Sequence, residues 1–125
     1  MQKKKSVLIT GGNKGIGLAT TKMFIDSGHQ VFVMARDFRN FPYANESCVK
    51  IVEYDLTNIE GIPELISSLP GIDILVNNAG IMYALPYNQY PAEKIQQMLK
   101  VNLEAPITLI TEVSKHMVDT GFGRI

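Results

Sequence analysis

The 125-residue sequence has a single cysteine, no tryptophan and no excess of charge of either sign. Because Cys48 is alone, an internal disulfide is excluded and a reducing, cytoplasmic location is expected. The 12 basic and 12 acidic residues balance, which argues against a nucleic-acid partner. No apolar run approaches the roughly 20 residues of a membrane span. The start, MQKKKS, also lacks the apolar segment of a signal peptide.

The chain is long enough for one folded domain and too short for two, so we expect a single domain over residues 1–125. A chain of this size buries roughly two-thirds of the surface of its unfolded state, which is enough for a hydrophobic core. No repeat, linker or low-complexity tract divides it, and no metal site is predicted. Glycine, in contrast, is well represented near the start of the chain.

The glycines cluster in one turn, Thr10–Gly17, whose sequence is TGGNKGIG. This turn follows the apolar run Ser6–Ile9 and precedes a segment with apolar residues at helical spacing. At Gly11, Gly15 and Gly17, the missing side chain permits left-handed backbone and lets a ligand approach the main chain. A helix N-terminus carries unpaired N–H groups and partial positive charge, so it attracts phosphate. The turn therefore predicts a dinucleotide-binding strand–turn–helix unit.

Apolar runs and helical patterns alternate along the chain. Lys50 and Glu53 interrupt the third apolar run, which favours an edge position for that strand. The alternation predicts an α/β fold, a doubly wound parallel sheet of the Rossmann-like kind, with its ligand at the carboxyl ends of the strands. The predicted strands are Val7–Thr10, Gln30–Ala35, Cys48–Tyr54 and Ile72–Asn77, and the predicted helices span about Lys14–Ser27, Pro63–Leu69 and Pro91–Thr120.

Two motifs carry a resemblance to a known family. TGxxxGxG in the first turn and NNAG after the fourth predicted strand, at this separation, resemble the short-chain dehydrogenase/reductase family, and the similarity spans Val7 to Ile125. The resemblance implies reversible hydride transfer between a nicotinamide cofactor and a small-molecule carbonyl or alcohol, and helix-paired homo-oligomers. The cofactor-binding residues that it implies are Gly11, Asn13, Lys14, Gly15, Ile16, Gly17, Arg36, Asp55, Leu56, Asn78, Ala79 and Gly80.

The residues at the end of the second predicted strand indicate which nicotinamide cofactor is bound. An acidic residue there would accept hydrogen bonds from the adenosine ribose and select NAD(H), but Ala35 cannot do so. Arg36 follows it, and a guanidinium is well shaped to bind a 2′-phosphate. In the family, basic residues here and at the position of Lys14 are typical of NADP(H) enzymes, and GGNKGIGLA with ARD is similar to the carbonyl-reductase branch. Asp37 leaves an alternative open, since its carboxylate suits a ribose and NAD(H).

Polar residues also end the third and fourth strands. Asp55 either caps a turn or, as the resemblance implies, contacts adenine together with Leu56. Asn77 and Asn78 are adjacent amides at the end of a buried strand, so both need hydrogen-bond partners. By resemblance, Asn77 braces the neighbouring strands and Asn78 lies along the cofactor.

The long C-terminal helical segment carries the one catalytic residue that we predict, Asn102. Its amide lies in an apolar stripe, so it is expected to be buried and hydrogen-bonded. Pro106 has no N–H to donate to the Asn102 carbonyl, which is left free for another donor. In the family this carbonyl holds a water of the proton relay; the alternative is a kinked helix with an ordinary core Asn. The expected stripe consists of Ile95, Met98, Leu99, Asn102, Pro106, Leu109, Ile110, Val113 and Met117.

The family's catalytic serine, tyrosine and lysine lie on a fifth strand and the helix after it. The sequence reaches Gly123–Ile125 where that strand is expected to start, so we expect a fold truncated before or within strand five, with little turnover by these residues alone. Tyr90 and Lys94 match Tyr-x-x-x-Lys, but Tyr90 precedes both Pro91 and Asn102 and is not expected to be catalytic. The alternative function is a non-catalytic dinucleotide-binding module.

Two further expectations concern the surface. His29 and His116 are predicted to be surface histidines, one in a turn and one late in a helix. Leu103 and Ile107 widen the apolar surface of the long helix beyond one face, so a second covering is expected. A partner subunit and further helices of the same protein are both consistent with this pattern.

Overall fold

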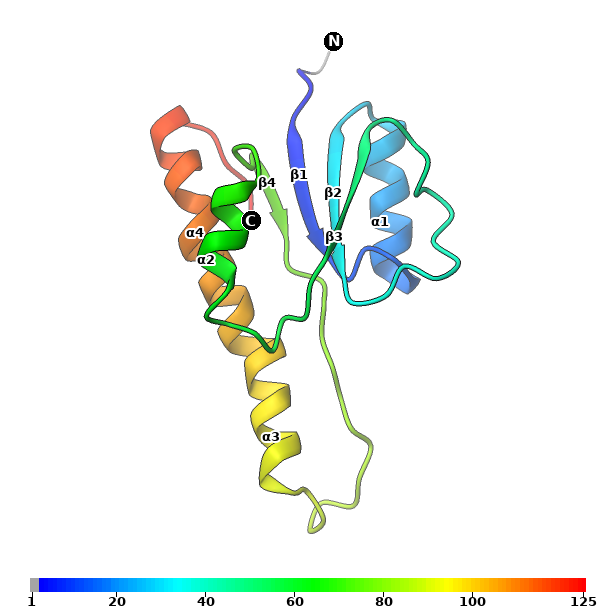
Figure 1. The fold of residues 1–125 in the computed structure, drawn as a ribbon, viewed down its shortest axis with the longest axis vertical. Coiled ribbons are helices and arrows are strands. Elements are labelled where there is room, and N and C mark those ends of the chain that lie inside the picture. Colours follow the sequence, from blue (N-terminus) through cyan, green and yellow to red (C-terminus); the bar gives the residue numbers. More distant parts are fainter. Residues whose placement is uncertain (1–2) are drawn as a thin grey trace.

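A computed structural model describes residues 3–125; Met1 and Gln2, at the beginning of the lysine-containing start, lie outside the described part. Strands and helices alternate as predicted, each within one or two residues of its expected bounds (Figure 1). The elements are β1 (Ser6–Thr10), α1 (Gly15–Asp26), β2 (Gln30–Ala35), β3 (Val49–Glu53), α2 (Ile62–Ser68), β4 (Ile74–Val76), α3 (Ala92–Leu99), the π-helical turn η1 (Lys100–Glu104) and α4 (Ala105–Thr120).

The four strands form one parallel sheet in the order β3-β2-β1-β4. The central strands β1 and β2 are buried almost throughout, as their apolar sequences predict for strands covered on both faces. β3 lies at the edge, with Lys50, Ile51 and Glu53 exposed. Beside β4, Arg124 pairs with Ile74 in an isolated parallel bridge, at the place where a fifth strand was expected to start. The predicted doubly wound α/β fold is confirmed.

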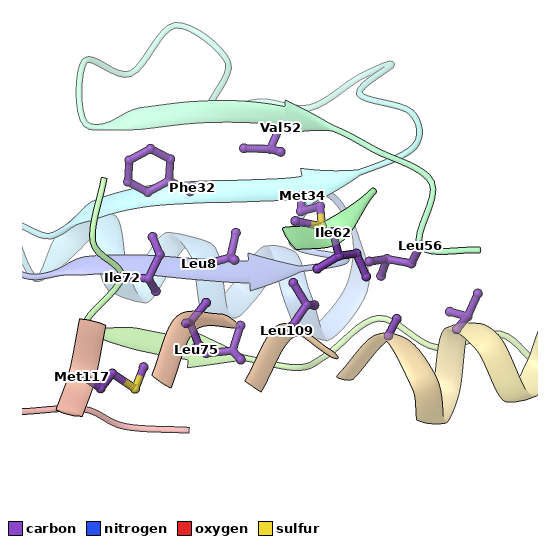
Figure 2. Close-up of a cluster of buried hydrophobic side chains, with 13 residues drawn as sticks. Leu8, Phe32, Met34, Val52, Leu56, Ile62, Ile72, Leu75, Leu109 and Met117 are labelled. Carbon is purple, nitrogen blue, oxygen red and sulfur yellow. The ribbon is translucent and has the colours of Figure 1, made fainter. Parts of the chain in front are cut away.

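Helices cover both faces of the sheet because successive strand residues point to opposite sides. Leu8 faces α2 and α4, whereas Ile9 faces α1. Figure 1 shows α1 on one side of the sheet and the α2–α4 pair on the other. The larger core lies on the α2–α4 side, where side chains from four strands meet two helices (Figure 2). Its largest fully buried members are Leu8, Met34, Ile62, Ile72, Leu75 and Leu109.

The long helical segment differs from the predicted stripe. Its buried positions are Val101, Ala105, Leu109, Val113 and Met117, of which the expected stripe contained only the last three. Two causes explain the difference. α3 has no buried residue and projects beyond the sheet (Figure 1). In η1, the N–H of Ala105 bonds to the carbonyl of Lys100, five residues back, so the helix has one extra residue in this turn. A single 3.6-residue period drawn through the segment is therefore out of phase on one side of η1.

The histidine prediction was wrong for His29. Its side chain is buried, and Nδ1 accepts a hydrogen bond from the N–H of Lys5 at 3.1 Å, because the turn between α1 and β2 folds against the start of β1. His116 is half-buried, with Nε2 3.4 Å from Oδ1 of Asp73. Within residues 3–125, every helix is too short or too polar to cross a membrane.

Candidate nucleotide-binding site

The glycine turn leaves an open surface in front of α1. Gly15 has φ of +57°, and a Cβ built on it would meet no heavy atom within 4 Å. Lys14 is the N-cap of α1, and in this part of the described chain no side chain caps the helix. At the start of this helix, the N–H of Leu18 bonds back to the carbonyl of Lys14. The N–H groups of Gly15, Ile16 and Gly17 therefore face the turn, where the partial positive charge of the helix attracts an anion.

The other glycines of the turn make close packing possible. A Cβ on Gly17 would overlap the carbonyl oxygen of Gly11, so α1 packs directly on the turn. Gly12 lies against Thr21, whose hydroxyl donates to the Gly12 carbonyl at 2.9 Å. Thr21 is fully buried and was not predicted as a site residue. Its position on the apolar side of α1 is the feature of the sequence that could have indicated it. Together these contacts fix the turn on which a diphosphate would lie.

The bracing amide after β4 is Asn78, and the prediction that Asn77 has this role was wrong. Nδ2 of Asn78 donates to the carbonyls of Thr10 and Gly11, each at 3.1 Å. The hydroxyl of Thr10 in turn accepts from the N–H groups of Asn78 at 3.1 Å and Ala79 at 2.9 Å. Asn77 is exposed instead, because alternate residues of an extended strand point to opposite sides. Thr10, buried at the end of β1, is a second residue that the sequence analysis missed.

Basic side chains gather where β2 ends. Arg36 and Lys14 are both exposed, and within residues 3–125 neither makes an ion pair. The amide of Asn13 donates to the main-chain carbonyl of Asp37 at 2.8 Å, which ties the glycine turn to this chain segment. The Asp37 carboxylate is bound by Arg39, whose hydrogen bonds hold the pKa of that carboxyl below its usual value; the charge of Lys14 lowers it further. Arg39 was not predicted as a site residue, although the spacing Asp-x-Arg in a turn could have indicated that its side chain binds Asp37.

After β3, Asp55 caps a turn, which was one of the two predicted roles. Its Oδ1 accepts from the N–H of Thr57 at 2.9 Å and from the Thr57 hydroxyl at 2.8 Å. The bond from the N–H lowers the pKa of Asp55 despite partial burial, and the charge of Arg36 adds to this effect. Leu56 is buried in the larger core, so only its main chain is open to a ligand.

Asn102 is hydrogen-bonded as predicted but exposed, so the prediction that it is buried was wrong. Its Oδ1 accepts from the N–H of Ile81 at 2.8 Å, and its Nδ2 donates to the Ile81 carbonyl at 2.7 Å. The side chain faces a single extended segment after β4 rather than a sheet, and a single segment covers it incompletely. A Cβ on Gly80 would lie 3.4 Å from the same Oδ1, so this amide also contacts the end of NNAG.

Tyr90 and Lys94, which match Tyr-x-x-x-Lys, both contact Tyr83. The Tyr90 hydroxyl donates to the carbonyl of Tyr83 at 2.6 Å, and Nζ of Lys94 lies 4.0 Å from the centre of the Tyr83 ring. Both contacts stabilise the loop before α3, which begins only at Ala92. A phenol committed to a main-chain carbonyl within this loop is structural.

The predicted cofactor residues follow the carboxyl ends of four parallel strands. The glycine turn follows β1, Arg36 follows β2, Asp55 follows β3, and Asn78 follows β4. Because parallel strands end at the same edge of a sheet, these segments lie together at the edge of the sheet to which the strand arrows point in Figure 1. The arrangement offers main-chain donors for a diphosphate, and Lys14 and Arg36, which have no ion-pair partner among the described residues, lie in the segments that follow β1 and β2.

Comparisons with known proteins agree with this geometry. The family model described as short chain dehydrogenase matches residues 5–125. The NADP-dependent 3-hydroxy acid dehydrogenase YdfG of Escherichia coli strain K12 is 31% identical over 127 residues, covering 95% of this chain and 51% of the relative. A structure of 4-hydroxyisoleucine dehydrogenase complexed with NADH has a TM-score of 0.88 at 30% identity, covering 95% of this chain and 51% of that chain. The structure of ElxO with NADP bound has a TM-score of 0.83 at 26% identity, and the match covers 97% of this chain and 53% of the ElxO chain.

The chain thus spans about half the length of the curated relatives that it matches. The match nevertheless runs from before β1 to the last residue, and it includes both the glycine turn and NNAG. This chain belongs to the short-chain dehydrogenase/reductase family.

Proposed function

We propose that this chain forms the NADP(H)-binding part of an oxidoreductase that transfers hydride between the cofactor and a small carbonyl or alcohol substrate. The observation that carries the proposal is the charge pairing where β2 ends. Lys14 and Arg36 are exposed and, between residues 3 and 125, lack a carboxylate partner, whereas Asp37 is bound by Arg39. Two cations are thus available to a 2′-phosphate, and the nearby carboxylate already accepts hydrogen bonds from Arg39.

The remaining parts of the site suit the other parts of such a nucleotide. The open glycine turn and the N–H groups at the start of α1 would hold the diphosphate. Asp55 and the main chain of Leu56 would lie beside adenine, although Oδ1 of Asp55 is already bonded to Thr57. Asn78, Ala79 and Gly80 would line the cofactor farther along, with Asn78 acting through the turn that it braces.

In the reductive direction, a reduced nicotinamide held by these residues would supply a hydride for the carbonyl carbon, and the carbonyl oxygen would need a proton. The residue of this chain that we assign to the proton path is Asn102, through its main-chain carbonyl. Asn102 lies in η1, where the bond from Ala105 to Lys100 interrupts the regular helical pattern, and Pro106, four residues on, has no N–H to donate to its carbonyl. The side-chain bonds to Ile81 fix the position of Asn102, and its carbonyl is proposed to hold a water.

The comparisons support a nicotinamide cofactor and leave its type to experiment. The E. coli relative is named as NADP-dependent, and ElxO was solved with NADP, but 4-hydroxyisoleucine dehydrogenase was solved with NADH. For this chain, the cations beside the glycine turn favour NADP(H). We further propose that residues 1–125 by themselves bind the cofactor without turnover, because the family's Ser and Tyr-x-x-x-Lys have no counterpart at the corresponding places of this sequence.

The test is a fluorescence titration of the chain with NADPH and with NADH. Wild type should bind NADPH more tightly, and Lys14→Ala or Arg36→Ala should each weaken NADPH about tenfold, the effect of one charge-assisted bond, while leaving NADH unchanged. Lys22→Ala is the matched control: it removes a cation from the same helix, but one that is paired with Asp26. Equal affinity of wild type for both cofactors would refute the phosphate assignment, and no binding of either would refute the nucleotide site.

We also propose that the full protein is a homo-oligomer that uses one side of the long helix. Leu103 and Ile107 lie 53% and 55% exposed on consecutive turns, and Leu99 and Ile95 continue the row. An apolar row of this kind on a helix favours burial against another helix. Further helices of the same protein are the alternative covering.

A further inference from the structure

We propose that Arg39 sets the cofactor preference of this site by occupying the carboxylate of Asp37, which would otherwise accept a ribose hydroxyl and repel a 2′-phosphate. The inference rests on the proposed function and goes one step beyond it. It assigns a positioning role to a residue that the glycine and NNAG motifs do not include. It also explains how an acidic residue can stand directly after Arg36 without favouring NAD(H).

The geometry occupies both oxygens of the Asp37 carboxylate. Nε of Arg39 donates to Oδ2 at 2.7 Å, and a second guanidinium nitrogen, Nη2, lies 2.6 Å from the same oxygen. The main-chain N–H of Arg39 donates to Oδ1 at 2.8 Å. A carboxylate that accepts two hydrogen bonds and an ion-pair contact from one residue has less capacity left for hydroxyl groups of a ligand, and its charge is compensated at short range.

This carboxylate is part of the same site as the proposed phosphate ligands. The Asp37 main chain is bonded to the side chain of Asn13 at 2.8 Å, and Asn13 precedes Lys14 in the glycine turn. The charge of Lys14 is close enough to lower the pKa of Asp37, after the larger effects of the Arg39 hydrogen bonds. Arg36 is adjacent in sequence. An uncompensated carboxylate here would weaken the attraction of both cations for a phosphate.

The turn that carries Arg39 is fixed by its neighbours. Phe38 and Phe41 pack edge to face, with ring centres 5.4 Å apart, in the core on the α1 side of the sheet. The N–H of Phe41 bonds to the carbonyl of Phe38 at 3.1 Å, and Asn40 adopts a left-handed backbone with φ of 62°. Arg39 therefore projects into solvent from a turn anchored on both sides. Its guanidinium needs little reorganisation to reach Asp37.

An ordinary surface ion pair is the alternative explanation. The side chains of Arg39 and Asp37 are 86% and 49% exposed, and pairs this exposed contribute little to folding. The two explanations differ in what they predict. A purely structural pair would change neither cofactor's affinity when it is broken, whereas a masking pair changes their ratio while stability stays almost constant.

The experiment is a double-mutant cycle on wild type, Arg39→Ala, Asp37→Asn and the double variant. The ratio of the NADH dissociation constant to that of NADPH is measured by fluorescence titration. Arg39→Ala should lower this ratio about fivefold, the size expected from one unit charge a few ångströms away in water. In the Asp37→Asn background, the same Arg substitution should leave the ratio unchanged, and Arg39→Lys should restore part of the loss. Lys22→Ala, which breaks another exposed ion pair, is the control and should have no effect.

Each other outcome has a defined meaning. If wild type prefers NADPH and Arg39→Ala keeps the ratio, the masking role is refuted and the proposed function stands. If Arg39→Ala weakens NADPH equally in the Asp37→Asn background, Arg39 contacts the phosphate directly and masking is again refuted. If wild type shows no preference for NADPH, both the phosphate assignment and the masking role fail.

Discussion

Replacement of Asn78 by alanine tests the brace between β1 and β4 most directly. The substitution removes two hydrogen bonds that join Nδ2 to the carbonyls of Thr10 and Gly11. Each such bond contributes about 1 kcal/mol net, and carbonyls left unpaired near the buried Thr10 raise the cost, so we expect a loss of about 2–3 kcal/mol. With an unfolding entropy of about 2.1 cal/mol/K per residue, the melting temperature of a chain of this length should fall by roughly 10 °C.

The assay is urea unfolding followed by circular dichroism, with Asn77→Ala as the control. Asn77 is adjacent, has the same side chain and is exposed, so its loss should stay within about 0.5 kcal/mol. Asn78→Asp sharpens the test, because an ionised carboxylate cannot donate and would face two carbonyl oxygens. That variant should regain stability as the pH falls and the introduced group becomes protonated. Similar losses for the Asn77 and Asn78 alanine variants, or no loss at Asn78, would refute the assignment of the brace.

Three other predictions follow from single contacts. Gly17→Ala places a Cβ against the carbonyl of Gly11, so nucleotide affinity measured by titration should fall at least tenfold; unchanged binding would mean that α1 does not pack on the turn as described. Because the bond from Thr57 lowers the folded-state pKa of Asp55, its contribution to stability should be present above the unfolded value of about 3.9 and be lost as the pH falls through the folded value. Asp55→Ala should therefore destabilise the chain by about 1 kcal/mol at pH 7 and by less in acid, as measured by unfolding; an equal effect at both pH values would contradict this. Leu103→Glu should lower the oligomer mass of the full protein in light scattering without unfolding it, unless helices of the same protein cover this side.

The order of strands and helices was predictable because the apolar runs are long and bounded by turn residues. β1 ends at the glycine turn, and α1 ends before Gly28, which has φ of 81°. Lys50 in the third run correctly indicated an edge strand, since a cation is readily solvated there. Each of these signals involves only residues that are neighbours in the sequence, so it can be recognised without knowledge of the fold.

The features that could not be predicted depend on which side of an element faces its neighbours, or on contacts between segments that are far apart in the sequence. The choice between Asn77 and Asn78 depends on which side of an extended segment faces β1, and a pair of identical residues gives no preference. The burial of His29 depends on a contact with Lys5 that no spacing rule contains. The contact of Arg39 with Asp37 depends on a turn in which Phe38 and Phe41 pack against each other. In each case the missing information is tertiary.

The extra residue in η1 has a consequence for how freely the two parts of the helix can vary. Past the wide turn, α4 has a buried residue on almost every turn, so most changes there alter the hydrophobic core. Before it, α3 buries nothing in the core of residues 3–125, so substitutions there should change the free energy of unfolding of this part little. One helical segment thus combines a part whose sequence is constrained by the hydrophobic core with a part whose apolar row, Ile95 and Leu99, is constrained only by whatever covers it.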